Sequence, residues 1–158
     1  KFAFGNAGSA TGHIMPLATL RDGGVTLRDL AHFQFFGHHD KVVKAVLDGT
    51  CDAGGIIEEV AKEYVLQGIR ILTLSVKIPE FNVCCNKSVD REIRDRIRDA
   101  LVSLDMSRQS DAMLLTSLGK DCTGFVAASA EEYEEFREKL LGVADQVALA
   151  EQHLPHKS

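Results

Sequence analysis

The chain has 158 residues, of which 45% are hydrophobic and 26% charged, a balance typical of one globular domain or two small lobes. No apolar run approaches the ~20 residues that a membrane-spanning helix needs. A net charge of −5, without a basic stripe carrying interleaved aromatic residues, argues against nucleic acid as a partner.

The first residues show no targeting signal. The opening "KFAFG", residues 1–5, has no positively charged n-region, apolar h-region or cleavage site, and begins directly with a strand-like alternation. We therefore expect a mature fragment or a piece of a longer protein, from which any targeting signal would be lost.

The first half of the chain predicts alternating strands and helices. Strands are expected at 2–4, 32–37, 51–57 and 69–76, and helices from about 11–13 to "RDGG", over 39–49 and over 58–68. Pro16 fits a helix only in its first turn, and Thr26 with Asp29 predicts a short helix cap. The order βαβαβαβ with short connections indicates an α/β fold with a mostly parallel sheet flanked by helices.

The second half predicts mainly helices. Pro79 in "KIPEFN", 77–82, indicates a crossover or hinge. The next segment, "NVCCNKS", is expected to be a strand. Helices are expected from Ile93 to Leu104, over 107–119, and from a Ser129 cap through the stripe Tyr133, Phe136, Leu140, Val143 and Val147. "TGFVAAS" reads as a short extended piece. These helices have too little sheet to cover, so we expect their partner strands to come from absent N-terminal sequence, another chain or a different packing.

Residues 4–16, "FGNAGSATGHIMP", form the first candidate binding stretch, where a strand gives way to a helix. Free backbone N–H groups and the helix dipole favour an anion there. Ser9 and Thr11 add hydroxyl donors, and Gly8 and Gly12 allow close approach to the backbone. Hydrogen bonds to an oxyanion contribute roughly 1.5–3 kcal/mol each, so three or four can hold a tetrahedral anion without a lysine. The alternative is a capped turn; neither a Walker loop nor a dinucleotide fingerprint is present.

Two further strand ends fall at the same edge of the predicted sheet. "GHHD", 37–40, offers histidine donors to an anion, although solvated or helix-capping histidines are the alternative. "GGIIEE", 54–59, places Glu58 and Glu59 at a helix start, where either can bind an amino group or a phosphoryl proton, or simply complement the helix dipole. No third ligand has a spacing that suits a metal ion.

The four cysteines give little support to catalysis; they are Cys51, Cys84, Cys85 and Cys122. Adjacent Cys84 and Cys85 lack the spacing of paired zinc ligands. Val83 and Phe81 beside them indicate burial rather than a reactive thiol. Free buried thiols are the simplest interpretation, and pairing stays open.

Four stretches in one register carry a family resemblance. "GNAGSATGHIMP" is similar to a motif Asp-Pro-x-Ser-Thr-Ser-Gly-x-x-x-Pro, and "GHHDKVVKAVLDGTCDAGG", 37–55, to Gly-Ser-His-Asp followed by Ala-Val-x-x-Gly-x-x-Asp-Ala-Gly. "IPEFNVCCN" looks like the return strand and "GFVAASAEEY", 124–133, like a later segment of the same proteins. Together they resemble the phosphate, phosphite and phosphonate-binding proteins of ABC importers over nearly the whole chain.

The resemblance implies a type II periplasmic-binding fold, which has two lobes. Its second lobe would be residues 1–77, an α/β ligand-binding lobe, followed by a hinge or crossover at 78–82. Residues 83–151 would be the strand and helices that return to the first lobe, with a tail at 152–158. The chain would then hold one full lobe and a partial second one, and its uncovered return helices make a homo-oligomer an expectation.

The resemblance also implies the binding residues. In the family, the Ser-Thr-Ser run and the histidine bind the phosphonyl oxygens. The corresponding positions here are Ser9, Ala10, Thr11, Gly12 and His39, with Glu58 or Glu59 as the carboxylate that follows the Asp-Ala-Gly strand.

Two positions depart from the family pattern. Ala10 lacks the middle hydroxyl, and Phe81 stands where phosphonate binders often have an acid. An aminoalkyl phosphonate is therefore in doubt, and a smaller or different ligand is open.

The expected function is the solute-binding component of an ABC importer for phosphonate, phosphite or phosphate, with a permease as partner. It would be periplasmic or otherwise extracytoplasmic, and it would use neither catalysis nor a cofactor. One alternative is a ligand-sensing input domain of the same fold in a signalling protein. A second is a small α/β enzyme with a cysteine nucleophile.

Overall fold

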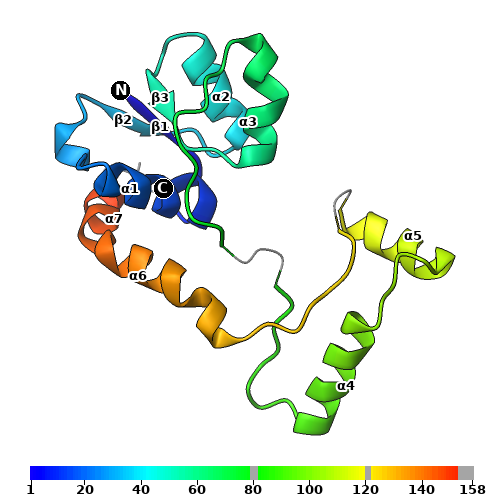
Figure 1. Ribbon diagram of the computed structural model, residues 1–158. Coiled ribbons are helices and arrows are strands. Elements are labelled where there is room, and N and C mark those ends of the chain that lie inside the picture. The colour runs from blue at the N-terminus through cyan, green and yellow to red at the C-terminus, as the bar shows by residue number, and fades with distance from the viewer. Residues whose placement is uncertain (79–81, 120–121, 153–158) are drawn as a thin grey trace, which may run out of the picture. The chain divides into compact units, whose positions relative to one another are not determined.

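The computed structural model describes residues 1–78, 82–119 and 122–152, which fall into two compact units (Figure 1). Among the described residues, the first unit comprises 1–78 and 134–152, and the second comprises 82–119 and 122–133. Each unit is considered by itself.

A parallel sheet forms the centre of the first unit. Its strands are β1 (Phe2–Phe4), β2 (Phe33–Phe35) and β3 (Ala53–Gly54), in the order β2-β1-β3. In the register, Phe4 pairs with Phe35 and Ala3 with Gly54. The strands expected at 2–4, 32–37 and 51–57 are confirmed, the latter two in shorter form.

A helix follows each strand, as the βαβ pattern predicts. A π-helical turn, Ala10–Ile14, leads into α1 (Met15–Asp22), and Pro16 lies in the first turn of α1. The other two helices are α2 (His39–Leu47) and α3 (Glu58–Tyr64). The cap predicted at Thr26 is confirmed, because its backbone N–H and its hydroxyl donate to the Asp29 carboxylate at 2.8 and 2.7 Å.

The alternation of β1 divides the core of the first unit between the two faces of the sheet. Phe2 and Phe4 pack with Leu17 of α1 on one face. Ala3 points to the other face, where it packs with Val42 of α2. Successive strand residues face opposite sides, so the three residues of β1 serve both layers of helices.

The C-terminal helices α6 (Glu134–Gly142) and α7 (Ala144–Glu151) complete the first core. Val143 and Ala150 are fully buried in the cluster of Phe2 and Phe4. Lys139 of α6 pairs with Asp22 of α1 at 2.5 Å. The structure therefore groups 134–152 with the sheet, whereas the predicted boundaries place 83–151 together.

The prediction of one continuous long helix after Ser129 is wrong. A 3₁₀ turn at Ala130–Tyr133 precedes α6, and the helix breaks at Val143 before α7 begins. The break follows Gly142, where an added Cβ would overlap the Arg21 guanidinium. Interrupting the helix at this point places the side chain of Val143 in the core.

The strands expected at 69–76 and within 82–88 are wrong. These residues run without strand pairing, and Leu72 and Leu74 are 75% and 61% exposed. A strand needs a neighbouring backbone to receive its hydrogen bonds, and the described residues supply none here. The centre of the predicted hinge, 79–81, and the tail residues 153–158 lie outside the described residues.

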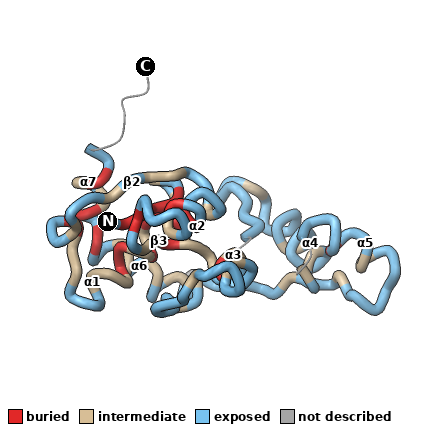
Figure 2. The backbone as a smooth tube through the Cα atoms, turned by 90° about the horizontal axis from the view of Figure 1, so that it is seen from above, coloured by how far each residue is buried: buried red, intermediate tan, exposed pale blue. Residues whose placement is uncertain are grey.

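The second unit has helices but, among its described residues, no strand. Its helices are α4 (Arg91–Val102) and α5 (Gln109–Leu118). The predicted apolar stripe of α4 stays largely open, with Ile93 51% and Ile97 44% exposed. Figure 2 shows the exposed character of both helices. This agrees with the expectation that these helices lack a sheet to cover.

The role of α7 in the first unit can be tested at Gln146, which is buried and whose Oε1 accepts the backbone N–H of Leu27 at 3.0 Å. Substituting Gln146→Leu leaves that buried N–H without an acceptor, so we expect the free energy of unfolding to fall by about 1–3 kcal/mol. Urea unfolding followed by circular dichroism measures the change. The matched control, Gln152→Leu at an exposed position, should stay within about 0.5 kcal/mol of the wild type; equal effects of the two substitutions would contradict the assignment.

Candidate functional site

Three loops meet at the carboxyl edge of the sheet, where open α/β folds bind ligands. The N–H of Gly37, after β2, donates to the Gly5 carbonyl at 3.1 Å, and the N–H of Gly55, after β3, donates to the Ala3 carbonyl at 3.0 Å. The loop after β1 therefore lies between the other two loops. All the residue stretches predicted to bind the ligand lie along this edge.

The loop after β1 is closed by contact between two glycines. The Gly5 N–H donates to the Gly12 carbonyl at 2.7 Å. A Cβ on Gly12 would lie 3.1 Å from the Gly5 Cα and 3.3 Å from the Ser9 Oγ. Inside the loop, the Ser9 N–H donates to the Asn6 carbonyl at 2.9 Å. The backbone itself thus fixes residues 5–12 in one compact conformation, which a side chain on Gly12 would disturb.

Ser9 and Thr11 stand together at the start of the helix. The Ser9 Oγ accepts the Gly12 N–H at 3.0 Å and lies 3.4 Å from the Thr11 Oγ1. Both residues are half-buried, as is Ala10 between them, while Gly12 is buried. A hydroxyl that accepts one bond still carries its own donor. The capping role of Ser9 is therefore compatible with donation to an anion.

His39 is the first residue of α2 and is half-buried. His38 precedes it with extended backbone as the N-cap, and Gly37 before that has φ +83°. This left-handed conformation, which glycine adopts at little cost, turns the chain from β2 into α2. Because Gly37 also bonds to Gly5, the segment that carries His39 adjoins the loop that carries Ser9.

Glu58 and Glu59 begin α3 and are exposed. The Glu58 carboxylate lies 2.7 Å from the Lys62 Nζ one turn later. The hydrogen bond from Lys62, aided by its charge, lowers the pKa of Glu58. Glu58 thus has a partner on its own helix, and its position in the first turn of α3 suits an acid that complements the helix dipole.

His13 is a buried polar residue that the sequence reasoning did not single out. It is fully buried, and its Nδ1 lies 2.6 Å from the Ala7 carbonyl oxygen. Its ring meets those of Phe4 and Phe35 edge-on, with centroids 5.3 and 4.8 Å away. Burial lowers the pKa of His13. Its position one helical turn before buried Leu17 was the available signal, because residues four apart share a helix face.

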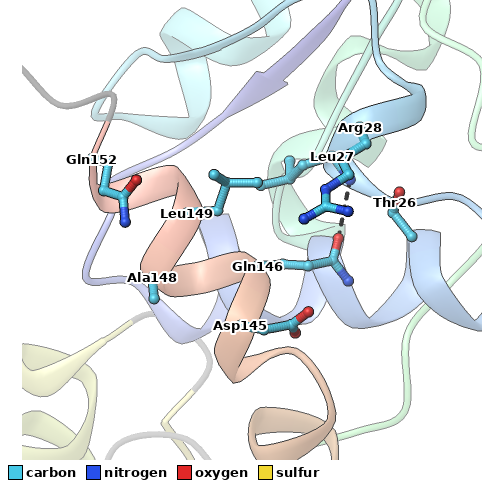
Figure 3. A pocket seen from close by; sticks show the side chains of 8 residues that line it. All are labelled: Thr26, Leu27, Arg28, Asp145, Gln146, Ala148, Leu149 and Gln152. Carbon is cyan, nitrogen blue, oxygen red and sulfur yellow. Dashed lines mark hydrogen bonds between the residues drawn. The ribbon is translucent and has the colours of Figure 1, made fainter.

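The first unit also contains a cavity away from these loops, about 380 Å³ in volume, between the 3₁₀ turn Leu27–Asp29 and α7 (Figure 3). Gln146 reaches across it to the backbone of Leu27. The full lining is Thr26, Leu27, Arg28, Asp145, Gln146, Ala148, Leu149 and Gln152. None of the predicted ligand-binding residues lines this cavity.

The cysteines are separated between the two units. The expected burial of Cys84 and Cys85 is wrong, because both are exposed in the second unit on a segment that has no sheet to pack against. Cys51 is buried in the first unit, and burial raises the pKa of its thiol. In the described ranges, His, Cys, Asp and Glu side chains do not gather in groups of three or more that suit a metal ion.

Within the part of the chain that the structure covers, no helix has both the length and the apolar character that crossing a membrane requires.

Comparisons with known proteins agree with these features. Residues 1–133 match the model of a protein family described as the periplasmic substrate-binding protein of phosphonate ABC transporters. Among solved structures, the fold is similar to that of PhnD1 from Prochlorococcus marinus (MIT 9301) in complex with methylphosphonate, with a TM-score of 0.66 and 19% identity. The match covers 91% of this chain and 57% of that one, so the chain spans little more than half the length of that structure. The expected α/β fold of a periplasmic binding protein is confirmed.

The contact between Gly5 and Gly12 leads to a prediction about the loop. Substituting Gly12→Ala pushes a methyl group against the Gly5 backbone, so we expect the free energy of unfolding to fall by about 1–3 kcal/mol. Gly8→Ala is the matched control, because a Cβ there would find its nearest neighbour, the Asn6 Oδ1, at 3.7 Å. Thermal and urea unfolding compare the two variants. Equal stabilities would show that the close approach does not constrain the loop.

Proposed function

Since this chain belongs to the family of periplasmic substrate-binding proteins of phosphonate ABC transporters, we propose that it binds a phosphorus oxyanion for import. The observation that carries the proposal is the loop of residues 5–12, which places two hydroxyls and a helix start at the carboxyl edge of the sheet. The similar fold of PhnD1, solved with methylphosphonate, supports the same ligand class.

The anion would sit at the start of the helix that leads into α1. Ala10 and Thr11 are the first helical residues, and N–H groups at such positions have no acceptor within the helix. Together with the hydroxyls of Ser9 and Thr11, they make four donors available to a tetrahedral oxyanion. Charge-assisted bonds of this kind are short and strong, and the helix dipole favours the negative charge. A lysine is not needed.

Secondary contacts would come from the neighbouring loops. We propose that His39 donates to the same anion from the start of α2. Glu58 and Glu59 would take part only with a ligand that carries an amino group or a phosphoryl proton, and the ion pair of Glu58 with Lys62 would first have to open. Because Ala10 offers no hydroxyl, a small anion such as phosphite, methylphosphonate or phosphate is the best candidate. Phe81, the other departure from the family pattern, lies outside the described residues.

The wider role follows from the family. The chain would act by binding rather than by catalysis, outside the cytoplasm, and would deliver its ligand to an ABC permease. Residues 1–77 would be the second lobe, 78–82 the hinge and 83–151 the return to the first lobe, and closure about the hinge would trap the anion. The match covers 57% of PhnD1, so we propose that the rest of the first lobe supplies the opposite wall of the cleft. The sensor and the cysteine enzyme are not favoured by these comparisons.

Anion binding can be measured by calorimetry with methylphosphonate, phosphite and phosphate. We expect the 158-residue chain to bind weakly, with a Kd nearer 1 mM than 1 μM, which corresponds to roughly −4 rather than −8 kcal/mol. Replacing Ser9→Ala together with Thr11→Val should weaken binding at least tenfold, since each lost bond to a charged group contributes roughly 1.5–3 kcal/mol.

The variant Ala10→Ser serves as the matched gain-of-function control, because it restores the middle hydroxyl of the family motif and should tighten binding. Sulfate serves as the ligand control for nonspecific attraction. Micromolar binding by the 158-residue chain would contradict the need for a second wall. Binding that is unaffected in the Ser9 and Thr11 double variant would overturn the proposed site.

We also propose that the chain self-associates through the exposed apolar residues of α4. Ile93 and Ile97 of α4 expose apolar surface one turn apart, so we expect the sedimentation coefficient to rise with protein concentration. The double variant Ile93→Lys, Ile97→Lys should remain monomeric at the same concentrations. A wild-type profile that stays monomeric at high concentration would contradict self-association.

A further inference from the structure

His13 is a buried polar side chain that the proposed anion site does not use. It is 0% exposed and lies directly after Gly12, on the π-helical turn Ala10–Ile14. The proposed binding loop, residues 5–12, is called the anion loop below. Burying an imidazole ring costs stability unless its polar atoms find partners, whereas an apolar ring would avoid that cost. The partners of His13 therefore indicate what the residue does.

The hydrogen bond of one ring nitrogen determines the tautomer of His13. The Nδ1 lies 2.6 Å from the Ala7 carbonyl oxygen, which can only accept, so the Nδ1 carries the proton. The Nε2 is buried and has no hydrogen-bond partner among the described residues. Burial, the largest influence, lowers the pKa of His13, whereas its hydrogen bond to the Ala7 backbone and the charge of Glu151 on α7 act in the opposite direction. The contact with Ala7 makes the ring a donor from Nδ1.

The packing of the ring aims this donor. Phe4 of β1 and Phe35 of β2 hold the imidazole at interplanar angles of 71° and 88°. Both phenylalanines belong to adjacent, paired strands, so the orientation of the ring is set by the sheet itself. His13 thus connects the hydrophobic core to the loop of residues 5–12.

The Ala7 carbonyl lies in a part of the loop whose other hydrogen bonds are all local. Ala7 lies between Asn6, whose carbonyl accepts the Ser9 N–H and whose Oδ1 accepts the Gly8 N–H, and Ser9, which caps the helix. The contact of Gly5 with Gly12 fixes the base of the loop, whereas the bond from His13 fixes its middle.

We propose that His13 is a positioning residue for the anion loop: its Nδ1–H, aimed by Phe4 and Phe35, holds the Ala7 carbonyl and so keeps Ser9 and Thr11 in their binding arrangement. The inference rests on the proposed function of the loop for its consequence in binding, but its structural part can be tested without ligand.

Three variants separate hydrogen bonding from packing. His13→Asn retains a donor near the position of Nδ1, His13→Gln carries its donor near the position of Nε2, and His13→Phe retains the ring without a donor. Amide hydrogen exchange, measured by NMR without ligand, reports on the Gly8, Ser9 and Gly12 N–H groups. We expect exchange at least tenfold faster in His13→Phe and His13→Gln, and within about threefold of the wild type in His13→Asn. A packing role predicts the reverse order, with His13→Phe unchanged and His13→Asn worst, and would overturn the inference.

The tautomer is a second, independent readout. Nitrogen-15 NMR of labelled histidine should show a protonated Nδ1 and an unprotonated Nε2 for His13 at pH 7. A protonated Nε2 with a bare Nδ1 would overturn the inference, because such a ring cannot donate to Ala7.

Calorimetry with methylphosphonate, phosphite and phosphate on the same proteins then tests the consequence. We expect His13→Phe to weaken binding at least tenfold and His13→Asn to stay within about threefold. If the exchange order holds and the wild type binds none of the three anions, the proposed function is overturned while loop positioning by His13 stands. If the wild type binds and His13→Phe binds equally well with unchanged exchange, the inference about His13 is overturned while the proposed function stands.

Discussion

The contact between the Gly5 and Gly12 backbones is the constraint on which the candidate site depends. A hydrogen bond of 2.7 Å joins the two residues, and neither position has room for a Cβ without a shift of the other backbone. Strand β1 ends just before Gly5, and the π-helical turn that contains Gly12 begins at Ala10. The contact therefore closes the loop between the strand and the helix tightly. Ser9 is thereby placed to cap the turn, and His13 enters the core within reach of Ala7. The proposed anion-binding loop and the hydrophobic core are consequently parts of one arrangement.

The rest of the first unit supports that loop from both faces of the sheet. Phe4 contributes to the cluster with Leu17 and Val143, while Ala3 contacts the layer of α2. The second unit has no comparable support, because α4 and α5 have no sheet among the described residues and keep Ile93 and Ile97 open.

The local features of the candidate site were predictable from the sequence, whereas its contacts with residues remote in sequence were not. Glycine and hydroxyl spacing in residues 4–16 predicts a loop suited to an anion, because both signals act within a few residues. The orientation of the His13 ring depends on Phe35, which is 22 positions away, so no local pattern reveals it. The ion pair of Glu58 with Lys62 follows an ordinary spacing of four residues, but Glu59, three residues before Lys62, was an alternative partner.

The amino-acid sequence by itself determined the βαβ order of the first 68 residues, the cap at Thr26, the loop after β1 and the family to which they point. These features rest on periodicity, glycine placement and short-range hydrogen bonds, which depend only on residues close together in sequence. Only the tertiary structure decided that residues 69–76 form no strand, that the last helix breaks at Val143, and that Gln146 joins α7 to Leu27. Each of these outcomes depends on a partner remote in sequence, because strand pairing and core burial are satisfied between segments rather than within them.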